Sequence, residues 1–266
     1  MNALIKWAAE NNLSSVFAVS TDVISVIIFV IFCWMRAPLY KLSKGKAAII
    51  IVSIIPVAYI GSYILFWAET GFRVWGATNI IRIYIWMIFF SWVFSNILNL
   101  QFNTIPDFLA PGIMLTFAIT HLGCVFEGCC EGYPSDWGIY NRYTGLLHFP
   151  VQIIESICAF IIFIILEKYQ SSNPEKAYGK LYPLFLILCG AMRFLTSFLR
   201  EDEKLVWGMS SLSFHSLSMI IVGILWFHYS KKHPSYILEK TELDRLKKKR
   251  KREKKHINNH PVSKHR

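Results

Sequence analysis

Seven long stretches of apolar residues dominate this sequence and limit what the chain can fold into. About 20 consecutive apolar residues let a helix cross the hydrocarbon core of a bilayer. Hydrophobic residues make up 54% of the chain and charged residues only 17%, where a soluble domain carries about 25% charged residues. This composition excludes a disordered chain and an ordinary cytosolic protein. The stretches are residues 16–35, 47–68, 80–98, 108–126, 151–166, 181–199 and 212–229.

The apolar stretches predict an all-α integral membrane protein with seven transmembrane helices. Residues 1–230 are expected to form the transmembrane domain, and residues 231–266 a basic tail. Lys and Arg are enriched in cytoplasmic loops, and here they gather in the links after the first and fifth stretches and in the tail. We therefore expect the N-terminus outside and the C-terminus inside the cell, with residues 127–150 forming a long extracytoplasmic loop after the fourth span. The basic residues of the two links are Arg36, Lys41, Lys44, Lys46, Lys168, Lys176 and Lys180.

The tail accounts for nearly all of the net charge of +11, because residues 231–266 contain 14 Lys/Arg and 4 Asp/Glu. One interpretation is a topology anchor that rests on anionic lipid headgroups. The other is a docking arm for nucleic acid or protein. Aromatic side chains that would stack on bases do not interleave the run Lys247–Arg252, so we expect no nucleic-acid partner.

Ionisable residues inside membrane spans are energetically costly and often functional. Arg193 is well inside its stretch, and the spacing of Arg193, Ser197 and Arg200 predicts a common helix face. Two guanidinium groups on one face could clamp a phosphate. The alternative is an ion pair between Arg193 and Glu155. Arg82 lies near the outer end of its stretch, where it could bind phosphate or extend to the interface.

The second candidate site is the cysteine-rich segment at residues 120–132. His121 and Cys124 stand one helical turn apart, and Cys129 and Cys130 follow. Three interpretations remain open: a disulfide, a soft-metal site, or a thiolate activated by His121. Adjacent cysteines rarely both bind one tetrahedral ion, which weighs against the metal. Three glycines are expected to break the helix and let backbone approach a ligand; they are Gly123, Gly128 and Gly132.

Several motifs together resemble the bacterial prolipoprotein diacylglyceryl transferase family and its cysteine-rich, diverged members. The resemblance covers residues 107 to 229, and it depends on the order and spacing of the motifs. They are Asp107-x-Leu-Ala-Pro-Gly112, Gly123-Cys-x-x-x-Gly-x-x-x-Gly132, Phe149-Pro-Val-Gln-Ile-Ile-Glu155, Gly190-Ala-Met-Arg-Phe194 with Arg200, and Gly208-Met-Ser-x-x-Ser-Phe.

The resemblance implies transfer of the diacylglyceryl group of phosphatidylglycerol to the lipobox cysteine of a prolipoprotein, with glycerol phosphate leaving. It also implies a multi-pass protein of the bacterial inner membrane whose partners are phosphatidylglycerol and the prolipoprotein signal peptide. We expect no cofactor and no metal. The expected catalytic residues are His121, Glu155, Cys129 and Cys130. The expected phosphate-binding residues are Arg193, Arg200 and Arg82, and the expected lining residues are Gln152, Cys124 and Gly123.

The chain also departs from the family pattern. His121 stands where the family has an arginine, Cys124 where it has an asparagine and Cys129 where it has an acidic residue. The His-Gly-Gly motif that the family has at its third span is absent, because the corresponding residues here read Trp75-Gly-Ala-Thr-Asn-Ile-Ile-Arg82. These departures leave two further hypotheses: a diverged enzyme with Cys129 or Cys130 as nucleophile, and a non-catalytic lipid-binding or thiol-redox membrane protein on the same scaffold.

Overall fold

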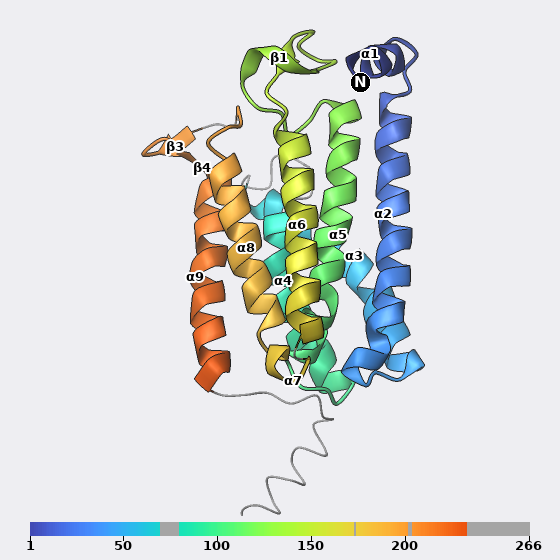
Figure 1. Cartoon of the computed structure of the whole chain (residues 1–266), viewed down its shortest axis with the longest axis vertical. Helices are drawn as coiled ribbons and strands as arrows, with labels where there is room; N and C mark the ends of the chain where they lie inside the picture. Colours follow the sequence, from blue (N-terminus) through green and yellow to red (C-terminus); the bar gives the residue numbers. More distant parts are fainter. Residues whose placement is uncertain (70–79, 173, 202–203, 233–266) are drawn as a thin grey trace, which may run out of the picture.

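The structure, a computed structural model, describes residues 1–69, 80–172, 174–201 and 204–232. Each of the seven apolar stretches forms a helix of 16 to 26 residues (Figure 1). The all-α prediction is therefore confirmed. The long helices are α2 (Ser14–Arg36), α3 (Lys44–Glu69), α4 (Ile80–Ile97), α5 (Thr104–Glu127), α6 (Val151–Ser172), α8 (Leu181–Thr196) and α9 (Ser211–Lys232).

Three helical segments among the described residues are long and apolar enough, by length and composition, to cross a membrane. They are Ser14–Tyr40, Thr104–Glu127 and Ser211–Lys232. Large apolar side chains remain exposed along α2, including those of Val16, Val23 and Ile31. Exposed contiguous apolar surface of this kind is suited to contact with lipid. The crossing of the membrane by all seven helices stays a prediction.

Short elements lie at the two ends of the bundle. Helix α1, the β1–β2 hairpin and the β3–β4 hairpin lie at one end, and α7 lies at the other (Figure 1). The apolar pattern did not predict these elements, because each is too short or too polar to produce a long apolar stretch. Their bounds are α1 (Asn2–Glu10), η1 (Ala37–Tyr40), α7 (Pro174–Ala177), β1 (Pro134–Tyr140), β2 (Leu147–His148), β3 (Lys204–Val206) and β4 (Met209–Ser210).

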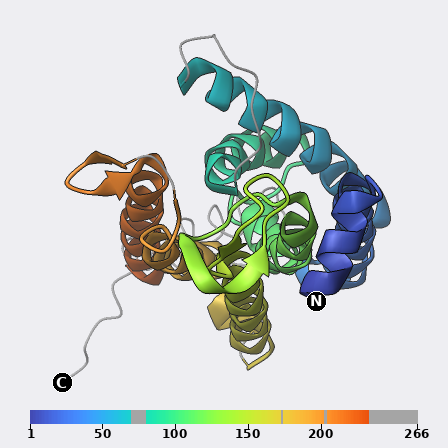
Figure 2. The same cartoon turned by 90° about the horizontal axis from the view of Figure 1, so that it is seen from above.

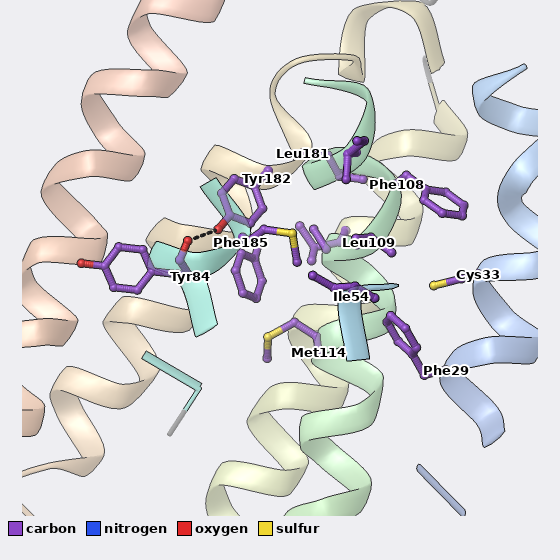
Figure 3. Packing of buried hydrophobic residues seen from close by; sticks show 14 of the residues in the cluster. Phe29, Cys33, Ile54, Tyr84, Phe108, Leu109, Met114, Leu181, Tyr182 and Phe185 are labelled. Atoms are coloured by element: carbon purple, nitrogen blue, oxygen red, sulfur yellow. Dashed lines mark hydrogen bonds between the residues drawn. The ribbon is translucent and has the colours of Figure 1, made fainter. Parts of the chain in front are cut away.

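Helix α5 is at the centre of the packing. Of its most apolar 18 residues, 61% are buried, whereas 17% are buried in the corresponding window of the candidate span Ser14–Tyr40. Seen from the hairpin end, α8 and α9 lie on one side of α5, with α2 and α3 on the other (Figure 2). Phe108, Leu109 and Met114 of α5 contribute to one buried cluster, which also includes Tyr182 and Phe185 of α8 (Figure 3). Helix α5 is thus positioned to hold side chains against several neighbours at once.

Glycines let α8 and α9 pack closely together. A Cβ atom built on Gly190 of α8 would lie 2.9 Å from the backbone oxygen of Ser216 in α9. The arrangement is reciprocal, since a Cβ atom on Gly223 of α9 would lie 2.9 Å from the backbone oxygen of Pro183. Small residues at helix contacts are typical of membrane helix pairs. This contact fixes the position of α8, which carries Arg193.

Two local predictions near the site were wrong. Helix α8 ends at Thr196, so Arg200 lies beyond the helix and does not share a helix face with Arg193. Gly123 does not break α5, which continues to Glu127 and ends at Gly128 with a left-handed φ of 75°. The predicted cytoplasmic tail, residues 231–266, lies almost entirely outside the described residues.

Candidate functional site

The carboxylate of Glu155 is the centre of the candidate site. It lies in the first turns of α6, and its side chain is fully buried. One carboxylate oxygen, Oε2, is 2.6 Å from a terminal guanidinium nitrogen of Arg193 and 2.9 Å from Nε2 of His121. The other oxygen accepts a hydrogen bond of 2.5 Å from the hydroxyl of Thr196. A buried carboxylate needs such partners to offset its loss of hydration.

Arg193 and Arg200 reach the same carboxylate from different backbone segments. Arg193 is in the last turn of α8, where its guanidinium also lies over the ring of Phe117. A guanidinium nitrogen of Arg200 is 3.8 Å from Oε2 of Glu155. The backbone of Arg200 forms an antiparallel bridge with Gly132, so the loop after α5 holds it in place. The two arginines therefore converge as expected, although a shared helix face does not bring them together.

The ion pair between Arg193 and Glu155 is the alternative that the sequence left open, and the structure contains it. Arg193 still has hydrogen-bonding capacity beyond this pair. Its Nε atom is buried and has no hydrogen-bond partner among the residues that the structure describes. Buried donors in folded proteins are nearly always paired. An Nε atom without a protein partner therefore indicates that a bound ligand supplies the acceptor.

His121 lies within α5, where its ring packs against that of Phe117 at a centroid distance of 3.8 Å and an interplanar angle of 33°. With Nε2 directed at Glu155, the other ring nitrogen, Nδ1, is buried and has no hydrogen-bond partner in the described part of the chain. A carboxylate that holds one ring nitrogen fixes the tautomer and orientation of the imidazole. This leaves the second nitrogen for a proton or a ligand.

Gln152 connects the charged cluster to the cysteine-rich loop. Its side chain is buried one turn before Glu155, and its Nε2 atom donates to the carbonyl oxygen of Cys129 at 2.9 Å. Within the described ranges its Oε1 atom has no hydrogen-bond donor. The polar pair expected from the motif thus lies in one buried environment, as the i, i+3 spacing on a helix predicts.

Three cysteines converge beside this cluster. Their sulfur atoms all lie within 4.8 Å of one another, and each cysteine is partly buried with a free thiol; they are Cys124, Cys129 and Cys130. The pKa of Cys130 is held well below its usual value, first by hydrogen bonds from the other two thiols and then by the positive charge of Arg200. The free thiols differ from the disulfide that the sequence left open.

The remaining predicted residues are placed differently. A Cβ atom on Gly123 would lie 2.0 Å from the hydroxyl oxygen of Thr21, so Gly123 permits close packing of α5 on α2. The backbone of Arg82 lies in the first turn of α4, and its side chain is outside the described part of the structure. Whether Arg82 binds phosphate stays a prediction.

Sequence reasoning missed Thr196, Phe117 and a cluster of serine hydroxyls. Ser213 forms hydrogen bonds with Ser197 and Ser210 at 2.8 and 3.3 Å, next to the end of α8. Ser210 and Ser213 belong to the motif Gly208-Met-Ser-x-x-Ser-Phe, whose pattern alone indicates no role for them. Thr196 follows Arg193 by three residues, and this helical spacing was the available signal that it could face the same partner.

The fold and the site define a helical, membrane-type protein with a buried cluster of carboxylate, guanidinium and imidazole groups beside three thiols. Residues 42–229, more than two thirds of the chain, match the family model described as prolipoprotein diacylglyceryl transferase. The chain therefore belongs to the prolipoprotein diacylglyceryl transferase family.

Similar proteins carry the corresponding name. The chain is 31% identical over 135 residues to a phosphatidylglycerol–prolipoprotein diacylglyceryl transferase 2 of Clostridium perfringens, covering 48% of this chain and 52% of that protein. It is 34% identical over 131 residues to the Clostridium tetani transferase, covering 46% and 51%. With the Bordetella parapertussis transferase it shares 32% identity over 151 residues, covering 54% and 57%. The chain thus spans about half the length of these curated relatives.

Proposed function

We propose that this protein transfers the diacylglyceryl group of phosphatidylglycerol, or a closely related lipid group, to the cysteine thiol of a prolipoprotein signal peptide. Family membership and the names of the relatives support the reaction. The observation that carries the proposal is the buried Nε atom of Arg193, which has no partner in the described structure although it adjoins the ion pair with Glu155. A phosphodiester oxygen is a suitable acceptor for it.

The reaction needs a cation for the leaving phosphate and a base for the attacking thiol. Arg193 and Arg200 supply the cationic groups, and they are already directed at one point by Glu155. As the bond between the glycerol carbon and the phosphate oxygen breaks, negative charge develops on that oxygen. Preorganised guanidinium groups stabilise this charge more than they stabilise the ground state.

His121 is the proposed base. We assign the proton of its neutral ring to Nε2, which faces Glu155, so that Nδ1 is the acceptor. The acceptor thiol gives its proton to Nδ1, and the sulfur electron pair forms the new bond to the glycerol carbon. The electron pair of the broken carbon–oxygen bond leaves with glycerol phosphate. Glu155 thus positions His121 and Arg193 together, and Gln152 lines the same site.

The proposed setting is the outer leaflet of the bacterial inner membrane, with seven spans and the N-terminus outside. The hairpins, the cysteine loop and α1 gather at the N-terminal end of the bundle (Figure 1). The basic residues Lys231 and Lys232 at the end of α9 are at the opposite end, which is expected to be cytoplasmic. Residues 1–230 would form the membrane domain and the basic tail would rest on anionic headgroups.

The test is transfer in membrane vesicles that contain the full chain, phosphatidylglycerol and a lipobox peptide. We expect a peptide with a diacylglyceryl thioether, detected by mass spectrometry. Arg193→Ala should reduce turnover by about 100-fold or more, because it removes a group that stabilises the transition state. Arg142→Ala is the matched control, since Arg142 lies at the same end of the bundle but pairs with Glu127 on a more exposed surface.

Arg193→Ala leaves the Glu155 carboxylate with fewer partners, so the amount of folded protein must be measured in parallel. Arg193→Lys retains the charge and a donor for Glu155 but loses the planar fork that suits phosphate. Folded Arg193→Lys protein with strongly reduced turnover would support the phosphate role. Undiminished transfer by folded Arg193→Ala protein would contradict it. A lipid adduct on Cys129 or Cys130 would instead favour the alternative of a diverged thiol enzyme.

A further inference from the structure

The cysteine cluster, defined as Cys124, Cys129 and Cys130, has the geometry of a ligand set. The three sulfur atoms lie within 4.8 Å of one another. Three ligand sulfurs around a tetrahedral zinc ion, each bonded at about 2.3 Å, lie about 3.8 Å apart. Modest rotation of the side chains would close the remaining difference. Among the described residues, no other group of three or more His, Cys, Asp or Glu side chains brings its ligand atoms this close together.

The backbone explains how two adjacent cysteines can face one point. In an extended strand, successive side chains point to opposite sides of the backbone. Here Gly128 and Cys130 both have left-handed φ angles, of 75° and 61°. The chain turns sharply after α5 and brings the thiols of Cys129 and Cys130 next to Cys124 in the last turn of that helix. Adjacent cysteines rarely both bind one ion, but this turn brings the two thiols to one point, so their adjacency does not weigh against a metal here.

The loop that carries the cluster is held from several sides. Gln152 donates to the carbonyl of Cys129 at 2.9 Å, and Asn141 donates to the carbonyl of Gly128 at 3.1 Å. The backbone bridge between Gly132 and Arg200 ties down the end of the loop. Outer contacts of this kind orient the ligands of protein metal sites.

The chemistry of the cluster favours a metal over a disulfide. An oxidised pair would leave the third thiol unused, whereas all three can bind one ion. Thiolates prefer soft or borderline cations such as Zn²⁺. Three thiolates around a divalent ion carry one net negative charge, and the backbone bridge to Gly132 holds the cationic residue Arg200 at the end of the loop that carries them. Burial of a charged site is less costly when an opposite charge is close by.

We propose that Cys124, Cys129 and Cys130 bind one thiophilic divalent cation, Zn²⁺ by preference, with water in the fourth position. A site with three protein ligands and one exchangeable position is suited to catalysis. If the acceptor thiol of the proposed reaction replaces the water, the metal lowers the pKa of that thiol, and its proton passes to His121. This last step rests on the proposed function, and the metal site itself does not.

The test begins with metal content. We would supply zinc, purify the whole chain without chelators, and measure bound zinc by inductively coupled plasma mass spectrometry. We expect about one zinc ion per chain. Replacement by Co²⁺ should produce the near-ultraviolet absorption of thiolate–cobalt bonds and the visible absorption of a tetrahedral ion. The variant Cys124→Ser/Cys129→Ser/Cys130→Ser should lose both signals, and Cys158→Ser should retain them, because Cys158 lies within α6 outside the cluster.

The outcomes separate the metal site from the proposed reaction. Three results would each overturn the metal site. The first is folded protein without stoichiometric zinc, and the second is retention of zinc by the triple variant. The third is a disulfide within the cluster, detected in protein whose free thiols were alkylated before the cells were broken. Zinc binding by a protein that shows no transfer would leave the metal site standing and contradict the proposed function. Full transfer by the folded triple variant would overturn the activation of the acceptor thiol by the metal.

Discussion

At the scale of single residues, one fully buried carboxylate organises the site. Glu155 contacts Arg193, His121 and Thr196 through its two oxygens. Breaking a buried ion pair by removing one partner commonly costs about 3–5 kcal/mol. Substitution of Glu155 would therefore affect folding together with activity. The partners of Glu155 are better targets for separating the roles in the reaction.

His121→Gln tests the proposed base. A glutamine can still donate a hydrogen bond to Glu155, but it cannot accept the proton of the acceptor thiol. We expect kcat to fall by about 10²- to 10⁴-fold, while KM for phosphatidylglycerol stays within about twofold, because Arg193 and Arg200 remain. Steady-state kinetics in vesicles of defined composition would measure both.

His215→Gln is the control for this substitution. His215 is half-buried on α9, where its Nδ1 atom contacts the backbone oxygen of Ser211 at 2.7 Å, and it has no proposed role in the reaction. Its replacement should leave kcat and KM unchanged. Equal activity of His121→Gln and the original protein would show that another group takes the proton.

At the scale of helices and strands, the sequence predicted the long helices well and the details of their ends poorly. Continuous apolar runs are a strong local signal, and each one became a helix. Beyond the end of α8, the backbone of Arg200 is bridged to Gly132, which is far from it in sequence. No local pattern encodes such a contact. The short helix α1 and the hairpins lack a long apolar stretch, and tertiary contacts such as that between Asn2 of α1 and Gly138 of β1 add to their stability.

In the candidate site, too, the sequence indicated which residues are involved but not how the fold arranges them. Four residues that the motifs singled out lie together in the structure, namely His121, Glu155, Arg193 and Arg200, and their roles stay predictions. Their arrangement around a single oxygen could not be predicted, because it combines three helices and a loop. The convergence of Cys129 and Cys130 depends on a left-handed residue that is not glycine, and such backbone conformations are rare outside glycine.

The close packing of α8 on α9 gives a prediction at this scale. In Gly190→Ala the new methyl group would lie 2.9 Å from the backbone oxygen of Ser216, so the helices must separate. Overpacking of this kind costs about 1–3 kcal/mol. We expect a lower Tm in detergent and reduced transfer, because α8 carries Arg193.

Gly45→Ala is the matched control for the packing prediction. Gly45 is also in a helix, α3, but a Cβ atom there would meet no heavy atom within 4 Å. Alanine favours the helix by up to about 1 kcal/mol relative to glycine, so the Tm should stay the same or rise slightly. A Tm decrease of the same size in both variants would contradict the role of Gly190 in the contact of α8 with α9.

At the scale of the whole molecule, the two ends of the bundle differ in composition and charge. The hairpins lie at the end that holds the N-terminus (Figure 1). The candidate site is on the same half of the bundle, near the end of α5 and the start of α6, and α9 finishes at the other end with Lys231 and Lys232. This arrangement agrees with the predicted orientation in the membrane, in which basic residues face the cytoplasm.

Epitope tags test this orientation directly. With a tag at each terminus, protease added to intact spheroplasts should remove the N-terminal tag and leave the C-terminal tag. Both tags should be removed after the membrane is lysed, which controls for protease access. Protection of the N-terminal tag in intact spheroplasts would contradict the proposed orientation. The site would then face the cytoplasm and not the outer side of the membrane, where the proposed reaction takes place.

The bridge between Gly132 and Arg200 has a consequence for the order of substrate binding. It joins the loop after α5 to the backbone of Arg200, whose guanidinium is proposed to hold the lipid headgroup. Displacement of that loop by an arriving polypeptide would move the guanidinium with it. Engagement of one substrate would thereby change the affinity for the other, and by thermodynamic reciprocity the effect would run equally in both directions.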